Sequence, residues 1–117
     1  MSDITRFETG PRMSQMVTYG ETVYTAGQVA LGAAGASVTE QTKDILGRID
    51  ALLEAAGSDK TKILTATIWL SNMDTFAEMN AVWDAWVPAG NTPCRACVES
   101  RLASPDFTVE IQVIAAR

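Results

Sequence analysis

The chain has 117 residues, of which 47% are hydrophobic and 20% are charged, which suits one domain with its own core and is too short for two. Its formal net charge is −5 and it has no cluster of Lys and Arg, so nucleic acid is not expected as a partner. The absence of His excludes a Ser-His-Asp triad, a Cys-His pair and a His-ligated zinc site. Neither a signal peptide nor a membrane-spanning stretch is indicated, and we expect a single domain over residues 1–117, in the cytoplasm and not on a membrane.

The first predicted elements are strands. Residues 15–26 are typical of a β-hairpin, because β-favouring residues flank a Gly-Glu turn at 20–21. These residues are Met16, Val17, Tyr19, Val23 and Tyr24. A further strand is predicted over 4–8, and the glycine-rich residues 31–36 indicate a flexible loop.

A helix is predicted over residues 38–56. Apolar residues recur there at helical spacing, at Ile45, Ile49, Leu52, Leu53 and Ala56. Either Ser37 or Thr39 can serve as the N-cap, and Gly57 supplies the C-terminal stop. The single apolar stripe indicates that one side of this helix packs on a core.

Residues 63–70 alternate in the manner of a strand. One face is predicted to carry Leu64, Ala66, Ile68 and Leu70, and the other Ile63, Thr65, Thr67 and Trp69. A turn with capping residues follows at 71–74, and a second helix runs from there to Pro88. Its stripe of Phe76, Met79, Trp83 and Trp86 is interpreted as core rather than as a cofactor site.

Two more strands, over 94–101 and 107–116, complete the predicted fold, with a turn at 102–106 between them. The order of elements favours an α+β fold with one sheet and both helices packed on one of its faces. The other face would include Trp69 and Ile114, whose exposure to water is costly, so we expect a second subunit to cover it.

Cys94 and Cys97 form a Cys-x-x-Cys pattern, which suggests redox chemistry or a metal site. In a strand, however, three residues span about 10 Å and the two side chains point to opposite faces. A disulfide requires Cα atoms within about 7 Å, and a zinc site would need further Cys or His ligands that the chain lacks. We therefore interpret the pair as two half-buried thiols that hold no metal.

Three other residues leave alternatives open. Arg95 shares a face of its strand with Cys97 and Glu99. One interpretation is a salt bridge with Glu99 or a neighbour, and the other is that the planar guanidinium binds a substrate carboxylate. Glu110 interrupts an apolar strand, and either faces solvent or serves as a general acid/base that holds a water. Gly27 is either a turn residue or a point where bare backbone approaches a ligand.

Five segments together resemble the RidA-like (YjgF) family of imine and enamine deaminases. They are residues 24–28, 41–42, 73–80, 92–99 and 109–115. Residues 92–99 are similar to the family's Pro-x-Arg-x-Cys-Val signature, and residues 109–115 to its closing Val-Glu-Ile strand. Within the family the chain most resembles the short YoaB-like branch, on residues 66–70 and 83–87.

The resemblance implies a chorismate-mutase-like fold in which three subunits pack their sheets into a central barrel, with active sites in the clefts between subunits. It implies cofactor-free hydrolysis of a 2-imino acid, or its enamine tautomer, to a 2-oxo acid and ammonia. Carried over by motif, Arg95 binds the carboxylate of a small substrate, Gly27 and Cys97 line the pocket, and Glu110 positions or activates a water.

Two residues of the implied substrate-binding pocket depart from the family's deaminases. Ala26 stands where they have Ser, and Met13 where they have Tyr. The carboxylate anchor is retained but the polar wall is altered, which favours a second hypothesis, a non-catalytic binding or regulatory protein for small carboxylate metabolites. Ribonuclease and holdase activities are also attached to the family. A ribonuclease is disfavoured by the acidic net charge and the absence of His. An oxidation-dependent holdase remains open, because the chain has five Met and two Cys.

Overall fold

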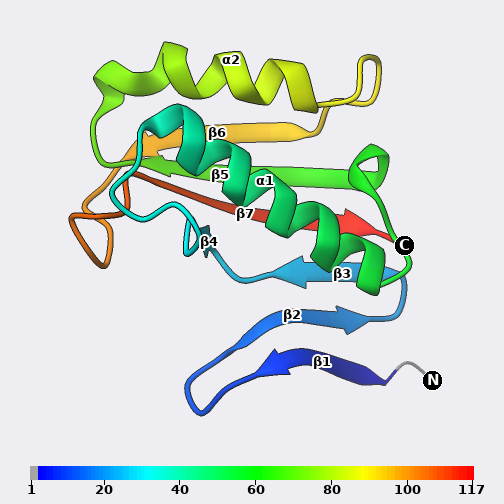
Figure 1. The fold of residues 1–117 in the computed structure, drawn as a ribbon. Coiled ribbons are helices and arrows are strands. Elements are labelled where there is room, and N and C mark those ends of the chain that lie inside the picture. Colours follow the sequence, from blue (N-terminus) through cyan, green and yellow to red (C-terminus); the bar gives the residue numbers. More distant parts are fainter. Residues whose placement is uncertain (1–2) are drawn as a thin grey trace.

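The computed structural model describes residues 3–117, which form one sheet and two long helices (Figure 1). In chain order the elements are β1 (Ile4–Thr9), β2 (Ser14–Tyr19), β3 (Thr22–Thr25), β4 (Gln28–Val29), α1 (Val38–Ala55), β5 (Ile63–Leu70), α2 (Phe76–Trp86), β6 (Cys94–Glu99) and β7 (Val109–Ala116). Short 3-10 turns, Lys60–Lys62 and Met73–Thr75, precede β5 and α2. Every predicted strand and helix is present, and the two-residue strand β4 was not predicted.

The sheet has the order β1-β2-β3-β7-β5-β6, with β4 paired to β7 as well. β5 and β6 are parallel and are joined through α2, whereas the other pairs are antiparallel. Figure 1 shows both helices on one side of the sheet. The predicted α+β architecture, with two helices packed on one face of a single sheet, is therefore confirmed.

Capping defines both ends of α1. Ser37 is the N-cap, and its hydroxyl accepts a hydrogen bond from the Glu40 N–H at 3.2 Å. Thr39, the alternative cap, instead donates through its N–H and its hydroxyl to Glu78 of α2, each at 2.9 Å. Gly57 follows the helix with a φ of 76°, a left-handed conformation that favours glycine, which confirms it as the stop.

The core lies between the helices and the sheet. Ile45, Ile49 and Leu53 of α1 are fully buried, as are alternate residues of β7 from Val109 to Ala115. Of the aromatic and Met stripe of α2, Met79 and Trp83 are buried, which confirms the core interpretation for the middle of the helix. Phe76 at its start is 38% exposed, so the stripe is core only in part.

The predicted alternation of β5 is wrong at its first residues. Ile63 is 5% exposed and Leu64 is 50% exposed, the reverse of the prediction. The register with β7 shifts between Ile63 and Thr65, and such an irregularity changes which face each side chain takes. From Ala66 onward the alternation is as predicted, with Ala66, Ile68 and Leu70 buried.

The face of the sheet opposite the helices, called here the open face, is apolar at several positions. Trp69 and Ile114 lie there, and each is only half-buried in the single chain. Their register partners Val98 and Tyr24 are 45% and 43% exposed. A contiguous apolar area of this kind is typical of a surface that another protein chain covers. Among residues 3–117, neither helix has the length and apolar character needed to cross a membrane.

Candidate functional site

Arg95 lies on β6, the edge strand that α2 covers. It pairs with buried Ala66 of β5, so its side chain is on the helix side of the sheet. Its Nη1 donates to Oδ1 of Asn80 at 2.8 Å. Its Cζ also lies 5.8 Å from the ring centre of Phe76 and 5.3 Å from that of Trp83, within range of cation–π attraction.

No acid neutralises this arginine. Within residues 3–117 the ion pairs closer than 4.0 Å are Glu40–Lys43 and Asp44–Arg48, and neither involves Arg95. The alternative of a salt bridge with Glu99 is wrong, because Glu99 accepts a hydrogen bond from the Met73 N–H at 2.9 Å instead. A half-buried guanidinium held by a neutral amide and two rings keeps its charge available to an external anion.

The two cysteines are separate free thiols on opposite faces of β6. Cys94 pairs with exposed Thr65, whereas Cys97 pairs with buried Ile68 and so lies on the same side as Arg95. This arrangement confirms the geometric argument against a disulfide, whereas the prediction of two half-buried thiols is wrong for Cys94, which is exposed. Burial raises the pKa of the Cys97 thiol, and the nearby positive charge of Arg95 opposes that rise only in part. The thiol is therefore protonated at neutral pH and is suited to lining a pocket rather than to nucleophilic attack.

Glu110 and Gly27 meet on the open face. Glu110, on β7, pairs with Trp69 of β5, and its carboxyl group is half-buried. Burial raises the pKa of this carboxyl group. A Cβ atom built on Gly27 would collide with the Glu110 carboxyl oxygen and lie 2.9 Å from its Cδ. Gly27 has no positive φ, so close approach to a side chain, not turn geometry, explains the glycine.

The remaining predicted pocket residues lie near the start of β2 and the end of β3. Ala26 precedes Gly27, and its N–H donates to the Gln15 carbonyl at 2.8 Å. Its carbonyl accepts a hydrogen bond from Gln28 Nε2 at 3.1 Å, which fixes the peptide next to Gly27. Met13 lies in the connection between β1 and β2 and is 47% exposed.

The strand register separates these residues into two half-sites. Arg95 pairs with Ala66 and Glu110 with Trp69, and residues three apart on β5 point to opposite faces. Arg95 and Cys97 therefore lie on the helix side, and Gly27 and Glu110 on the open face. Within one chain the structure does not bring the two halves together.

Sequence reasoning missed the residues that hold Arg95. The sequence pattern predicts Phe76 and Trp83 as part of the core stripe and gives Asn80 only as part of a segment that resembles the family. Their spacing was a usable signal, since residues four and three apart on a helix lie on one face. What the sequence did not supply is that this face of α2 lies over β6.

Comparison with known proteins gives consistent matches over nearly the whole chain. Residues 4–117 match the family model described as Endoribonuclease L-PSP. The RutC family protein YoaB of Escherichia coli is 42% identical over 113 residues, which cover 97% of each protein. The 2-iminobutanoate/2-iminopropanoate deaminase of Salmonella typhimurium is 33% identical over 109 residues, covering 88% of this chain and 85% of that protein.

A solved structure agrees with the sequence matches. The crystal structure of a member of the YjgF protein family from Neisseria meningitidis superposes with a TM-score of 0.95 and 48% identity. The match covers 98% of this chain and 95% of that one. The likeness therefore includes the whole sheet and both helices.

Proposed function

Because the chain belongs to the Endoribonuclease L-PSP family, the family of the RidA-like proteins, we propose that it hydrolyses 2-imino acids, or their enamine tautomers, to 2-oxo acids and ammonia. The observation that carries the proposal is the guanidinium of Arg95, which has a neutral hydrogen-bond partner and no acid within 4.0 Å in the described chain. The fork of an arginine matches the two oxygens of a carboxylate. Relatives such as the Salmonella typhimurium protein carry the name of an imino-acid deaminase, which supports the same reaction.

In the proposed mechanism Arg95 fixes the substrate carboxylate, and the imine carbon then lies toward Glu110. A water oxygen bonds to that carbon while the Glu110 carboxylate accepts one of the water's protons. From a protonated imine this gives a carbinolamine, and Glu110 then passes the proton to its nitrogen. As the carbon–nitrogen bond breaks, the new hydroxyl gives its proton to Glu110 and its oxygen becomes the carbonyl of the 2-oxo acid, while the nitrogen leaves as ammonia. A carboxyl group whose pKa is raised by burial is a stronger base than an exposed one, which suits this transfer.

We propose that a second copy of the chain completes each site, in a homotrimer. Arg95 and Cys97 of one subunit would face Gly27, Ala26 and Glu110 of its neighbour across a shared cleft. Two observations support this arrangement. The half-sites lie on opposite faces of one sheet, and the open face carries the exposed apolar side chains that a neighbour would cover.

The pocket wall beside Gly27 is less polar than in the deaminases that the chain resembles. Ala26 offers a methyl group, not a hydroxyl, and Met13 offers a flexible thioether. We expect these side chains to favour substrates with apolar groups next to the imine carbon. Cys97, with its protonated thiol, would line the opposite wall without reacting.

The test is a coupled assay in which an amino-acid oxidase produces imino acids in situ and the release of 2-oxo acid is followed. We expect the protein to accelerate release, and Arg95→Ala to lose about 2–5 kcal/mol of substrate binding. Arg12→Ala, which removes an exposed arginine in the β1–β2 connection, is the matched control. No acceleration by the wild type, or an unchanged rate in Arg95→Ala, contradicts the proposal.

A finer variant tests whether the arginine must be free of acids. Asn80→Asp places a carboxylate where the amide now accepts the Arg95 hydrogen bond at 2.8 Å. The new ion pair would compete with the substrate carboxylate, so KM should rise at least tenfold while the thermal midpoint holds or increases. A lower KM would show that the guanidinium does not bind the substrate.

The alternative function, non-catalytic binding of small carboxylates for storage or regulation, uses the same Arg95. The missing hydroxyl at Ala26 is the observation that favours it. Thermal stabilisation by 2-oxo acids, lost in Arg95→Ala and accompanied by no turnover of any imino acid, would select this alternative over the deaminase.

A further inference from the structure

A cavity lies at the carboxyl ends of the parallel strands β5 and β6, beyond the residues of the two half-sites. Its volume is about 820 Å³, within the usual range for sites that bind small molecules. The lining includes Ser71, which follows β5, and the segment 99–105 with Phe107, which leads from β6 to β7, and it includes neither Arg95 nor Glu110. The carboxyl ends of parallel strands joined by a helix are where α/β sheets bind ligands.

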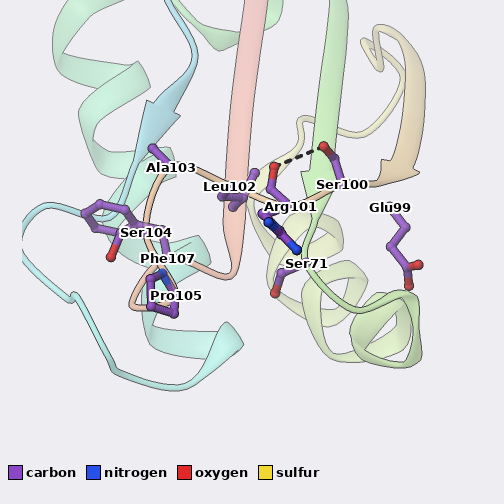
Figure 2. Close-up of a pocket in the computed structure, with 9 residues that line it drawn as sticks. All are labelled: Ser71, Glu99, Ser100, Arg101, Leu102, Ala103, Ser104, Pro105 and Phe107. Carbon is purple, nitrogen blue, oxygen red and sulfur yellow. Dashed lines mark hydrogen bonds between the residues drawn. The ribbon is translucent and has the colours of Figure 1, made fainter.

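The polar groups that this cavity leaves available are hydrogen-bond donors. Arg101 is exposed and has no ion-pair partner within 4.0 Å among residues 3–117. Ser104 accepts a hydrogen bond from the Asp106 N–H, which leaves its own O–H free, and no hydrogen bond of the described chain engages the Ser71 hydroxyl. Figure 2 shows the Arg101 guanidinium directed toward Ser71.

The acid in the lining does not neutralise this arginine. Glu99 is committed to the N–H of Met73, at 2.9 Å, and in Figure 2 its carboxyl group projects away from Arg101. The remaining polar contact drawn there is the Ser100 hydroxyl, which donates to the Arg101 carbonyl at 3.1 Å. The cavity therefore presents a cation that is not ion-paired and free hydroxyl donors, while the carboxylate in its lining, that of Glu99, is bound to the Met73 N–H and directed away from Arg101.

Buried hydrogen bonds hold the walls of the cavity in place. Gln41 of α1 is fully buried, and its Nε2 donates to the Asp106 carbonyl at 2.9 Å while its Oε1 accepts from the Thr108 N–H at 2.9 Å. The Ser71 N–H donates to the Thr108 carbonyl at 3.1 Å, which ties the Ser71 wall to the residue that Gln41 also binds. A site that is already ordered loses less conformational entropy when it binds.

The rest of the lining is apolar. Leu102, Pro105 and Phe107 contribute hydrocarbon surface beside the donors, and Leu102 and Phe107 are half-buried. We propose that this cavity binds a small organic oxyanion, a phosphate or carboxylate group on an apolar body. The oxyanion would lie against Arg101, Ser71 and Ser104, and its apolar body against Phe107. This site is separate from the proposed deaminase site.

The test is calorimetric titration of the native oligomer with phenyl phosphate and with benzoate, which carry the two oxyanions on the same ring. Saturable binding of at least one is expected, and Arg101→Gln should weaken it about tenfold or more. The matched controls are Arg12→Gln, an exposed arginine outside the cavity, and Arg95→Gln, which removes the proposed catalytic anchor. Arg12→Gln should alter neither affinity by more than about twofold. Arg95→Gln should leave the affinity for phenyl phosphate within the same range, whereas benzoate can also bind at the proposed deaminase site and is compared only between wild type and Arg101→Gln.

Several outcomes would overturn the proposal. They are the absence of saturable binding by both ligands, an equal loss in Arg12→Gln, and a loss in Arg95→Gln with Arg101→Gln unchanged. Inorganic phosphate that binds as tightly as phenyl phosphate would refute the role of the apolar wall. If Arg101→Gln unfolds at a lower temperature than the wild type, Ser71→Ala provides an independent test of the cavity. Ser71→Ala should weaken ligand binding and leave the deaminase rate unchanged.

Discussion

Gly27→Ala should impair the site through a single steric contact. The added Cβ would collide with the Glu110 carboxyl oxygen and approach its Cδ to 2.9 Å and its Cγ to 3.2 Å. The backbone itself can accept alanine, since Gly27 has no positive φ. The strain therefore falls on the end of the Glu110 side chain, which is flexible and only half-buried and can rotate away from residue 27.

The magnitude follows from that rotation. A side chain forced out of its rotamer costs about 0.5–1.5 kcal/mol, so Gly27→Ala should lower the free energy of unfolding by about 1 kcal/mol. The effect on the reaction should be larger, because a well-placed proton-transfer group contributes about 10²–10⁴-fold and Glu110 would no longer be well placed. The variant should thus fold and yet lose most of its imino-acid hydrolysis.

A double-mutant cycle with Glu110→Ala isolates the contact. Urea unfolding, followed by circular dichroism, should show the cost of Gly27→Ala in the wild type and almost none in the Glu110→Ala background, where the collision partner is absent. An equal cost in both backgrounds would mean that Gly27 serves the fold in some other way, and the steric reasoning would be refuted. So would a Gly27→Ala variant with full activity.

Three further outcomes are expected. Gly47→Ala, in the middle of α1 where an added Cβ meets nothing within 4 Å, should raise the free energy of unfolding by about 0.5–1 kcal/mol in urea melts, and a loss of stability would contradict this. Burial raises the pKa of Glu110, so the protonated group contributes its full stability below its unfolded pKa, and this contribution is lost as pH rises through its folded pKa. Glu110→Gln, which cannot ionise, should therefore gain stability relative to the wild type as pH rises through that range, measured as the difference in thermal midpoint, and a constant difference would contradict this. Iodoacetamide should alkylate exposed Cys94 faster than Cys97, whose pKa is raised by burial, as followed by mass spectrometry with Cys94→Ser as reference; equal rates would contradict the placement of the two thiols on β6.

Much of the fold follows from periodicity in the sequence. Alternation over residues 107–116 and the apolar stripe of α1 are strong signals, because each element has one buried side. The signal fails at Leu64, where a register shift with β7 exchanges the two faces. It also fails at β4, whose two residues are too few to show any period. Both features depend on pairing with a distant strand.

The candidate site was predictable in its residue types and not in its arrangement. Periodicity places Arg95 and Cys97 on one face of β6, and this holds in the structure. The sequence offers two interpretations of Gly27, a turn residue or a point where backbone approaches a ligand, whereas in the structure it is the Glu110 side chain that lies against this glycine. The sequence also allows Glu99 to pair with Arg95, because residues that are four positions apart on a strand lie on the same face. In the structure Glu99 instead accepts a hydrogen bond from the Met73 N–H, in the turn before α2.

The position of β5 between β6 and β7 has a consequence for the chemistry of the proposed site. Were Arg95 and Glu110 on the same face of one chain, the guanidinium and the carboxylate would attract each other, and a substrate carboxylate would have to displace Glu110. Their pairing with Ala66 and Trp69 puts the sheet between them, so neither group neutralises the other within one chain. The same separation lets Asn80 and two aromatic rings orient Arg95 without neutralising it. In the proposed homotrimer, a carboxylate-binding cation of one chain and a proton-accepting acid of the next would thus meet, unpaired, around a substrate.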